Sequence, residues 1–397
     1  MISSASRLND VTTYYFVRRL AEIDTMNKDG GAMVINLGIG SPDLLPPASV
    51  TQKLISALDA ADAHKYQSYK GIPALRKAFS MWYNTHFNVV INPDTQVLPL
   101  IGSKEGVMHV SMSFLDPGDE VLVPNPGYPS YSMCTRLAGG TPVDMPLIER
   151  LDWKPDLTAL SKKDLSKVKL MWLNYPNMPT GVKANLTFFN EVVSFAKQYN
   201  ILICHDNPYT LILNDQPLSI FNAAGAEDVA LELISLSKCY NMAGWRVGGI
   251  IGAKPYIDTI MTFKSNMDSG MFKPVQEAAA VALGMDSDWT DVLNAEYQKR
   301  KDGACEIMEL LDLEYDKNGA GLFVWGKIKD PSVTGDMLAD KLLYEARVFI
   351  TPGHIFGTQG NQYLRISLCS PVEEMEAAAY RIRTGFNIQT TSKTVKS

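Results

Sequence analysis

One stretch decides how this chain is interpreted: Ser235-Leu236-Ser237-Lys238-Cys239-Tyr240-Asn241-Met242-Ala243-Gly244-Trp245-Arg246-Val247-Gly248-Gly249. It begins where an apolar run, residues 230–236, predicts a buried strand, and Lys238 follows at the end of that strand. Burial disfavours the charged form of a lysine and leaves a nucleophilic amine at neutral pH, which forms imines with aldehydes. The hydroxyls of Ser235 and Ser237 and the guanidinium of Arg246 are donors of the kind that bind a phosphate dianion.

Pyridoxal 5'-phosphate is an aldehyde that carries a phosphate, so the combination predicts that Lys238 holds this cofactor. An ordinary strand that ends in a surface lysine explains any one of these residues equally well. From Ser235 to Gly248 the stretch resembles the lysine signature of the class I/II aminotransferases, which are fold-type I pyridoxal-phosphate enzymes. The resemblance implies an α/β fold. Its large domain has a mostly parallel seven-stranded sheet between helices, and a smaller α+β domain is built from both chain ends.

The length of the chain and its change in character predict two domains. A chain of 397 residues exceeds what one hydrophobic core usually supports. Alternating strands and helices give way to short strands and a helix beyond a boundary near 285–315. We therefore place a large cofactor-binding domain at residues 46–285 and a small domain at residues 1–45 and 286–397. An amphipathic helix predicted at residues 10–27 belongs to the small domain.

Composition and charge exclude several classes of function. The net charge is −6, from 37 Lys and Arg against 43 Asp and Glu, so no overall positive field attracts nucleic acid. No apolar run is long enough to cross a membrane, and the start of the chain lacks the apolar core of a secretory signal. We expect a cytoplasmic protein that binds neither nucleic acid nor a membrane.

Cysteine and histidine spacing predicts neither a disulfide nor a metal site. The five cysteines are odd in number and scattered, with no C-x-x-C pair. The five histidines show no metal-type spacing. We expect reduced, mostly buried cysteines and no metal.

A second buried strand, predicted at residues 201–206, ends in a carboxylate, Asp206. Strands of this apolar type belong to parallel sheets covered on both faces, and their carboxyl ends carry the chemistry. The resemblance implies that Asp206 pairs with the pyridine nitrogen of the cofactor and keeps it protonated, which makes the ring an electron sink. Tyr209 is expected to lean toward the ring hydroxyl. The alternative is a helix cap for Asp206 and a core position for Tyr209.

Further contacts with the cofactor are expected from three other segments. Gly102, Ser103 and Lys104 open a predicted helix, and free backbone amides at a helix N-terminus bind anions. Tyr128, in a loop stiffened by prolines, resembles the family's aromatic ring that stacks on the pyridine. Tyr66 resembles the tyrosine that reaches the cofactor phosphate of the other subunit, which implies a homodimer with shared active sites. Alone, each segment is equally an ordinary helix start or a stiff loop.

One motif departs from the family that the chain resembles. The usual sequence has Asn directly before Pro-Thr-Gly, and the amide of that Asn contacts the ring hydroxyl of the cofactor. This chain has Met178 there, and a thioether cannot donate such a bond. We expect Asn177 to compensate from one residue earlier, although a shift of one residue normally turns a side chain away.

Two residues are expected to contact the substrate. Gly40, in a glycine turn that follows a short strand, would lie against it, although Gly-x-Gly alone is most often just a turn. Arg365 follows Pro-Gly and Phe-Gly at the spacing at which the family clamps the α-carboxylate of the substrate by two parallel hydrogen bonds.

Together these residues predict an aminotransferase that moves an amino group between an L-amino acid and a 2-oxo acid through an imine at Lys238. Three alternatives stay open. A β-lyase or related lyase uses the same fold, and a non-catalytic binding protein retains it. A nicotinamide-dependent dehydrogenase also suits an α/β chain, but the Gly-x-Gly-x-x-Gly fingerprint is missing. Catalytic roles are expected for Lys238, Asp206 and Tyr209.

Overall fold

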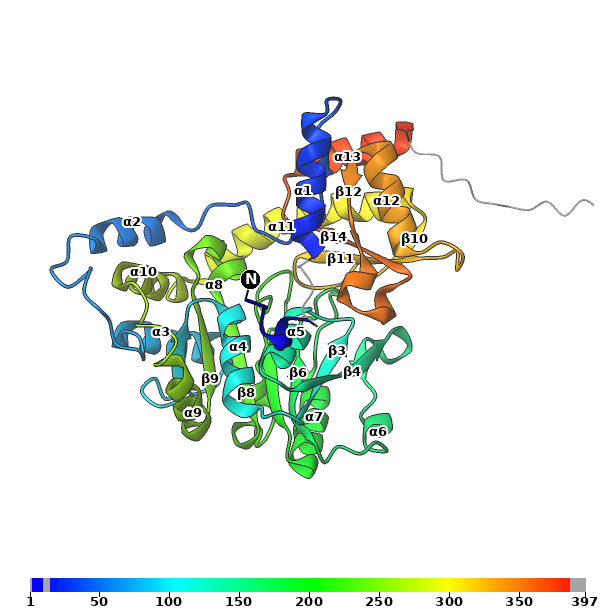
Figure 1. Cartoon of the computed structure of the whole chain (residues 1–397). Coiled ribbons are helices and arrows are strands. Elements are labelled where there is room, and N and C mark those ends of the chain that lie inside the picture. Colours follow the sequence, from blue (N-terminus) through cyan, green and yellow to red (C-terminus); the bar gives the residue numbers. More distant parts are fainter. Residues whose placement is uncertain (1, 10–14, 386–397) are drawn as a thin grey trace, which may run out of the picture.

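The computed structural model describes residues 2–9 and 15–385. A large sheet forms the core of the lower body in Figure 1, and a small antiparallel sheet lies above it, beside helices α1, α12 and α13. The predicted α/β fold with a large and a small sheet region is confirmed.

The large sheet has eight strands in the order β2-β9-β8-β7-β6-β3-β4-β5. The five strands from β8 to β4 in this order are mutually parallel, whereas β9 runs antiparallel to both of its neighbours. Seven strands correspond to the predicted sheet, and the two-residue β5 adds an antiparallel edge that was not predicted. The strand bounds, in spatial order, are Val97–Leu100, Gly248–Gly252, Ala230–Ser235, Leu202–Asp206, Val168–Leu173, Glu120–Asn125, Thr141–Ile148 and Lys154–Pro155.

Helices cover both faces of this sheet, as the side chains of β6 demonstrate. Trp172 packs in one hydrophobic cluster with Val107 of α4, whereas the preceding Met171 packs in another with Phe189 of α7. Successive strand residues point to opposite faces, so the sheet is buried on both sides. The helices around it are α2 Ala48–Ala57, α3 Pro73–Phe87, α4 Ser103–Phe114, α5 Ser130–Leu137, α6 Leu157–Leu160, α7 Leu186–Tyr199, α8 Leu236–Cys239, α9 Lys254–Lys264 and α10 Lys273–Leu283.

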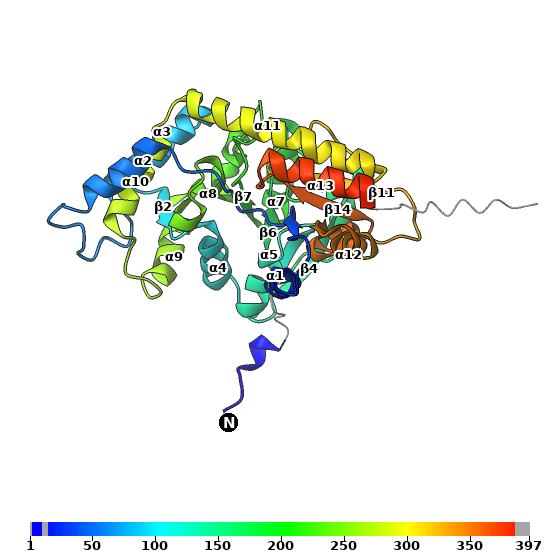
Figure 2. The same cartoon turned by 90° about the horizontal axis from the view of Figure 1, so that it is seen from above.

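The small sheet is antiparallel, in the order β10-β11-β14-β13. Figure 2 shows α11 running along the upper edge of the view, from the side of α3 to the side of α13. The bounds are β10 Leu313–Tyr315, β11 Phe323–Ile328, β13 Thr351–Pro352, β14 Tyr363–Ser367, α11 Ser287–Leu310, α12 Gly335–Ala346 and α13 Val372–Gly385.

The N-terminal segment pairs with the C-terminal part of the chain. Strand β1, Ile35–Asn36, runs parallel to β12, Val348–Phe349. Helix α1 occupies Tyr15–Lys28 of the predicted 10–27, and residues 10–14 lie outside the described part of the chain. This pairing supports our proposal that residues 1–45 and 286–397 form one domain and residues 46–285 the other.

The structure contains no described helix that combines the length and the apolar character needed to span a membrane.

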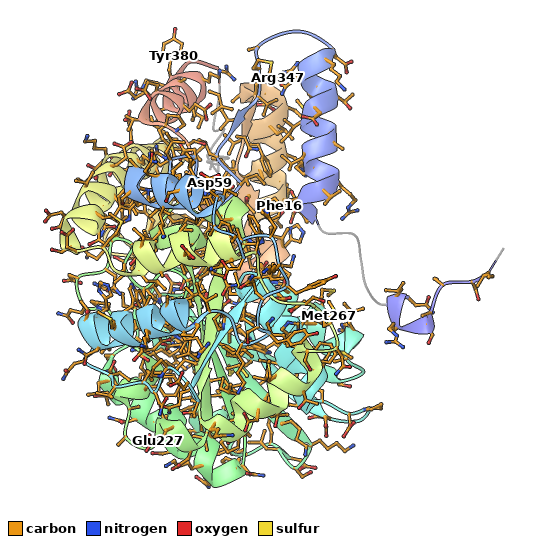
Figure 3. All side chains as sticks on the ribbon, turned by 90° about the vertical axis from the view of Figure 1, so that its left-hand side faces the viewer. Phe16, Asp59, Glu227, Met267, Arg347 and Tyr380 are labelled. Carbon is orange, nitrogen blue, oxygen red and sulfur yellow. The ribbon has the colours of Figure 1, made fainter. Side chains whose placement is uncertain are left out.

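Phe16 lies at the end of α1 that faces the large sheet (Figure 3). The aromatic end of this helix therefore points to the junction between the two sheets.

Candidate active site

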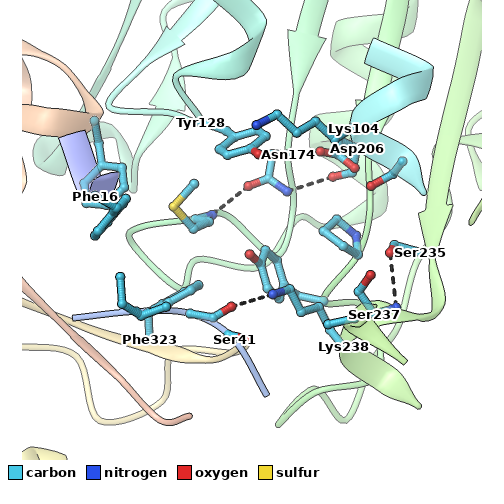
Figure 4. Close-up of a pocket in the computed structure, with 18 of the residues that line it drawn as sticks. Phe16, Ser41, Lys104, Tyr128, Asn174, Asp206, Ser235, Ser237, Lys238 and Phe323 are labelled. Atoms are coloured by element: carbon cyan, nitrogen blue, oxygen red, sulfur yellow. Dashed lines mark hydrogen bonds between the residues drawn. The ribbon is translucent and has the colours of Figure 1, made fainter. Parts of the chain in front are cut away.

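A cavity of about 680 Å³ lies where the carboxyl ends of β7 and β8 meet the small sheet and α1. Figure 4 shows part of its lining, with Ser235 and Ser237 at one end and Phe16 and Phe323 at the other. Of the residues predicted for the site, the cavity is lined by Gly40, Ser103, Lys104, Tyr128, Asp206, Tyr209, Ser235, Ser237, Lys238, Arg246 and Arg365.

Lys238 lies in the single turn of helix α8 that follows β8 directly. Its Nζ donates a hydrogen bond to the backbone carbonyl of Gly40 at 2.5 Å. Burial lowers the pKa of Lys238, and the charges of Arg365 and Arg246 lower it further. The neutral amine that the sequence predicted is therefore favoured at this position.

The seryl end of the cavity has the geometry of an anion site. The Oγ of Ser235 accepts a hydrogen bond from the backbone N–H of Ser237 at 3.2 Å, which caps α8. Gly102 precedes α4 with a φ of +82°, and a Cβ added to it would lie 2.2 Å from Nη2 of Arg246. Glycine at position 102 thus lets the guanidinium approach the N-terminus of α4, where Ser103 begins the helix and unpaired amides favour an anion.

Asp206 is the last residue of strand β7, and only one of its two carboxylate oxygens has a hydrogen-bond partner among the described residues. The hydroxyl of Tyr131 donates to Oδ2 at 2.9 Å, whereas Oδ1 is buried and has no hydrogen-bond partner among the described residues. Burial raises the pKa of Asp206 to about 6, against the opposing effects of Tyr131 and His205. A buried carboxylate with an open oxygen is best satisfied by a cation or a charged N–H donor.

Two tyrosines line the cavity around this carboxylate. Tyr209 is buried, burial raises the pKa of its hydroxyl, and its ring meets Phe323 edge to face with centroids 5.8 Å apart. Tyr128 lies across the cavity from Lys238 (Figure 4) and packs edge to face on Tyr131 at 5.6 Å. The cavity therefore presents two aromatic rings between its charged groups.

The position of Asn177 corrects the expectation that it contacts the cofactor. Its side-chain oxygen accepts from the hydroxyl of Thr180 at 2.8 Å, and its amide nitrogen donates to the carbonyl of Asn174 at 3.1 Å. Both ends of the amide bind within the local turn, and Asn177 does not line the cavity. Met178 does line it, so a thioether replaces the amide that the resembled family has there.

Arg365, on β14, is buried against aromatic rings. Its guanidinium carbon lies 4.0 Å from the ring centroid of Phe323 and 4.5 Å from that of Phe356. Nη2 donates to the carbonyl of Gly38 at 2.8 Å, and Nη1 donates to Sδ of Met178 at 3.3 Å. A thioether is a weaker hydrogen-bond acceptor for a guanidinium than a carboxylate is.

Gly40 lines the cavity, whereas Tyr66 does not. A Cβ on Gly40 would lie 2.5 Å from the ring of Phe323, so only glycine fits between that ring and the cavity. Tyr66 is 90% exposed and does not line the cavity of its own chain. A role for Tyr66 therefore requires a second copy of the chain.

Sequence reasoning missed several residues of the cavity. The amide of Asn174, which follows β6, donates to the backbone carbonyl of Asp206 at 2.7 Å and holds the neighbouring strand end. Its place after one buried strand, beside a carboxylate after the next, was the available signal. No local pattern marked the apolar residues that come from distant segments: Phe16, Val17, Leu20, Ile39, Phe323 and Phe356.

One group of described residues outside the cavity has the composition of a metal site. Side-chain atoms of Glu105, His109 and Asp268 lie within 4.8 Å of one another. The ammonium of Lys264 binds Asp268 at 2.6 Å, so a cation of the protein already serves this carboxylate.

The cavity fits a phosphorylated pyridine aldehyde on three independent observations. The guanidinium of Arg246 lies next to Gly102 at the N-terminus of α4, which suits a phosphate. The buried amine of Lys238 suits an aldehyde. The open Oδ1 of Asp206 suits a protonated ring nitrogen.

Comparison with known proteins gives a consistent result. Residues 32–382 match the family described as aminotransferase class I and II. The LL-diaminopimelate aminotransferase of Dehalococcoides mccartyi is 41% identical over 377 residues, which cover 94% of this chain and 96% of that protein. The LL-diaminopimelate aminotransferase of Aquifex aeolicus is 39% identical over 388 residues, 96% of this chain and 99% of that protein. Substrate-bound BacF from Bacillus subtilis matches with a TM-score of 0.93 and 34% identity, covering 98% of this chain and 99% of that chain.

Proposed function

The chain belongs to the class I and II aminotransferase family, and from this premise we propose that the cavity around Lys238 is its active site. The protein is a pyridoxal-phosphate-dependent aminotransferase. The proposal is carried by the position of Lys238. It lies in one cavity with Arg246, at the anion site, and with the buried Asp206, whose Oδ1 has no hydrogen-bond partner among the described residues.

Lys238 has two tasks in this proposal. Bound pyridoxal phosphate supplies an electron sink for the charge that develops when an amino acid loses its α-proton. The amine of Lys238 would hold the cofactor, and it would also accept the α-proton of the substrate and return it. Its lowered pKa supports both tasks, because a proton acceptor must be neutral at the working pH.

The other residues bind and orient. Ser235, Ser237, Arg246 and the first amides of α4 would hold the phosphate. Asp206 would keep the ring nitrogen protonated, because a cation at Oδ1 compensates its buried charge. Tyr209 would donate to the ring hydroxyl, and Tyr128 would lie on the face of the ring.

Arg365 would clamp the α-carboxylate of the substrate. Its planar guanidinium is fixed by aromatic rings and by the carbonyl of Gly38, so little freedom is lost on binding. Gly40 keeps the wall beside Lys238 free of side-chain atoms. The substrates are an amino donor and a 2-oxo acid acceptor, both small molecules.

A homodimer and a cytoplasmic location complete the proposal. The high exposure of Tyr66 supports a role in the active site of the partner subunit. The five cysteines are free, which supports a reducing compartment. Two similar proteins are LL-diaminopimelate aminotransferases, which makes LL-diaminopimelate one candidate donor, an amino acid with a second ammonium and a second carboxylate at its far end.

The test is the Lys238→Ala variant beside a control, Lys254→Ala, whose lysine is exposed. Borohydride reduction of the wild-type protein and of the control should fix the cofactor on the peptide that contains residue 238, as measured by peptide mass. The Lys238→Ala variant should show neither this mass nor turnover with amino donors and 2-oxo acids. Normal turnover by Lys238→Ala would refute the proposed site. Release of pyruvate and ammonia in place of amino transfer would indicate a lyase.

A further inference from the structure

The two ends of the cavity differ in chemical character. Ser235 and Ser237 lie at one end, and Phe16 and Phe323 lie at the other (Figure 4). The charged side chains in the lining are Lys104, Asp206, Lys238, Arg246 and Arg365. Four of these have a place in the proposed function, and Lys104 belongs to the first turn of α4, on the side of the large sheet. The end near Phe16 therefore has Arg365 as its charged group.

The position of the substrate's side chain follows from its two anchors. Arg365 Nη2 lies 2.8 Å from the carbonyl of Gly38, and Lys238 Nζ lies 2.5 Å from the carbonyl of Gly40. The carbonyls that Arg365 and Lys238 contact thus belong to residues two apart in one segment, with Ile39 between them. An amino acid held at both anchors has its α-carbon beside Ile39.

The wall around Ile39 is apolar. Ile39 and Phe16 pack against the same small cluster, which includes Ile23 of α1. Val17 and Leu20 of α1 also line the cavity, where they remain 59% and 36% exposed. None of these side chains ionises or offers a hydrogen bond.

Two basic residues of α1, Arg18 and Arg19, lie between Val17 and Leu20 in the sequence, and neither lines the cavity. Arg19 donates to Glu22 at 2.8 Å and to Asp340 at 2.7 Å, and its Nε donates to the hydroxyl of Tyr15 at 3.1 Å. These contacts hold the guanidinium on the side of α12, and Arg19 does not line the cavity. The described wall residues Phe16, Val17, Leu20 and Ile39 include no basic side chain for a second carboxylate of the substrate.

We propose, on the basis of the function proposed above, that this wall selects amino donors with one carboxylate and an apolar side chain over LL-diaminopimelate. The distal ammonium and carboxylate of diaminopimelate would lie against a wall that pairs with neither, and an unpaired charge held against apolar side chains loses part of its hydration. An apolar side chain instead gains burial against Ile39 and α1. The specificity residues are Phe16, Val17, Leu20 and Ile39.

A donor panel on the holoenzyme tests this selection. Phenylalanine, leucine and methionine should each give a kcat/KM at least about tenfold above that of LL-diaminopimelate. An equal or higher value for LL-diaminopimelate would overturn the inference and leave the aminotransferase function intact. If no donor is turned over, the proposed function is contradicted. The selection between side chains is then tested by the binding of unreactive acids.

Unreactive acids provide that binding measurement. 3-Phenylpropanoate should raise the melting temperature of the holoenzyme at a concentration at least about tenfold below that at which pimelate, a dicarboxylate, has the same effect. Pimelate that binds as well as 3-phenylpropanoate would overturn the inference whether or not turnover is seen.

Two variants of α1 locate the selection. Leu20→Arg puts a cation into the apolar wall and should weaken 3-phenylpropanoate binding while strengthening pimelate binding, so that their ratio changes by about tenfold or more. Ala21→Arg adds the same charge at an exposed position of the same helix that does not line the cavity, and it should leave the ratio unchanged. An equal effect of both variants would show that overall charge, and not the wall, determines binding.

Discussion

Asp206 is the residue whose charge depends most on what the cavity holds. Burial raises its pKa from the ordinary 3.8 to about 6 in the cofactor-free protein. The folded state therefore binds a proton more tightly than the unfolded state, and stability falls as pH rises from about 4 to about 6. Above that range the full cost of the buried charge remains.

Asp206→Asn should remove this cost in the cofactor-free protein. Relative to wild type, its free energy of unfolding should be nearly unchanged at pH 4 and higher by up to about 3 kcal/mol at pH 7, from a shift of about two pKa units. Urea unfolding across this pH range measures the difference. Saturating cofactor should reverse the order, because a cation beside Asp206 then stabilises the charge. A difference that does not depend on pH would contradict this account.

Arg365→Lys tests the carboxylate clamp while it keeps the charge. Lysine cannot make two parallel hydrogen bonds, so KM should rise about tenfold to a hundredfold for every amino acid, whatever its side chain. Steady-state kinetics with three donors of different size measures this. A rise confined to one donor would assign Arg365 to side-chain recognition instead, and unchanged circular dichroism controls for folding.

The position of a single residue could be predicted from the sequence only where neighbouring residues in the chain determine it. Lys238 and Asp206 follow neighbouring buried strands, so the edge that they share could be predicted from the order of strands. The orientation of Asn177 could not be, because the bonds that turn its amide inward involve Thr180 and Asn174 within a tight turn. Tyr131, which binds Asp206, gave no sequence signal since it lies on a helix 75 residues earlier.

At the scale of elements, the N-terminus of α4 depends on the absence of a side chain at Gly102. Gly102→Ala should weaken cofactor binding to the cofactor-free protein by about tenfold or more, because the new Cβ displaces Arg246 from the phosphate end. Absorbance titration with pyridoxal phosphate measures the affinity.

Gly118→Ala is the matched control for this variant. Gly118 also has a positive φ, +101°, but a Cβ there meets nothing within 4 Å. Both substitutions carry the backbone strain of alanine at positive φ, about 1 kcal/mol. Equal losses of cofactor affinity in the two variants would assign the effect to strain and remove Gly102 from the phosphate site.

Elements with a strong apolar pattern were predicted closely, and those set by tertiary pairing were not. The strand expected at residues 201–206 is β7, Leu202–Asp206, because its apolar residues form one continuous run. Strand β5 has only Lys154 and Pro155 and forms through its pairing with β4. Two residues have no periodicity to detect, so the partner strand alone creates that element.

At the scale of the whole molecule, the two chain ends meet through β1 and β12, and Arg365 contacts Gly38 across the same junction. The hydrogen bond between Arg365 and Gly38 thus joins segments more than 300 residues apart in sequence. Contacts of this kind have no local signature, which is why the apolar wall of α1 was not predicted. Movement of the small sheet would displace Arg365 relative to Lys238.

The proposed homodimer makes a prediction that mixing experiments decide. Lys238→Ala lacks the reactive amine, and Tyr66→Ala lacks the exposed tyrosine that we assign to the partner's site. Each variant alone should be nearly inactive. In a hybrid dimer, one site has Lys238 from one subunit and Tyr66 from the other, whereas the second site lacks both. Random reassembly of equal amounts should therefore restore about a quarter of wild-type activity, since half of the dimers are hybrids with one intact site. If Tyr66 acts within its own subunit, every hybrid site lacks one of the two groups, and mixing restores nothing.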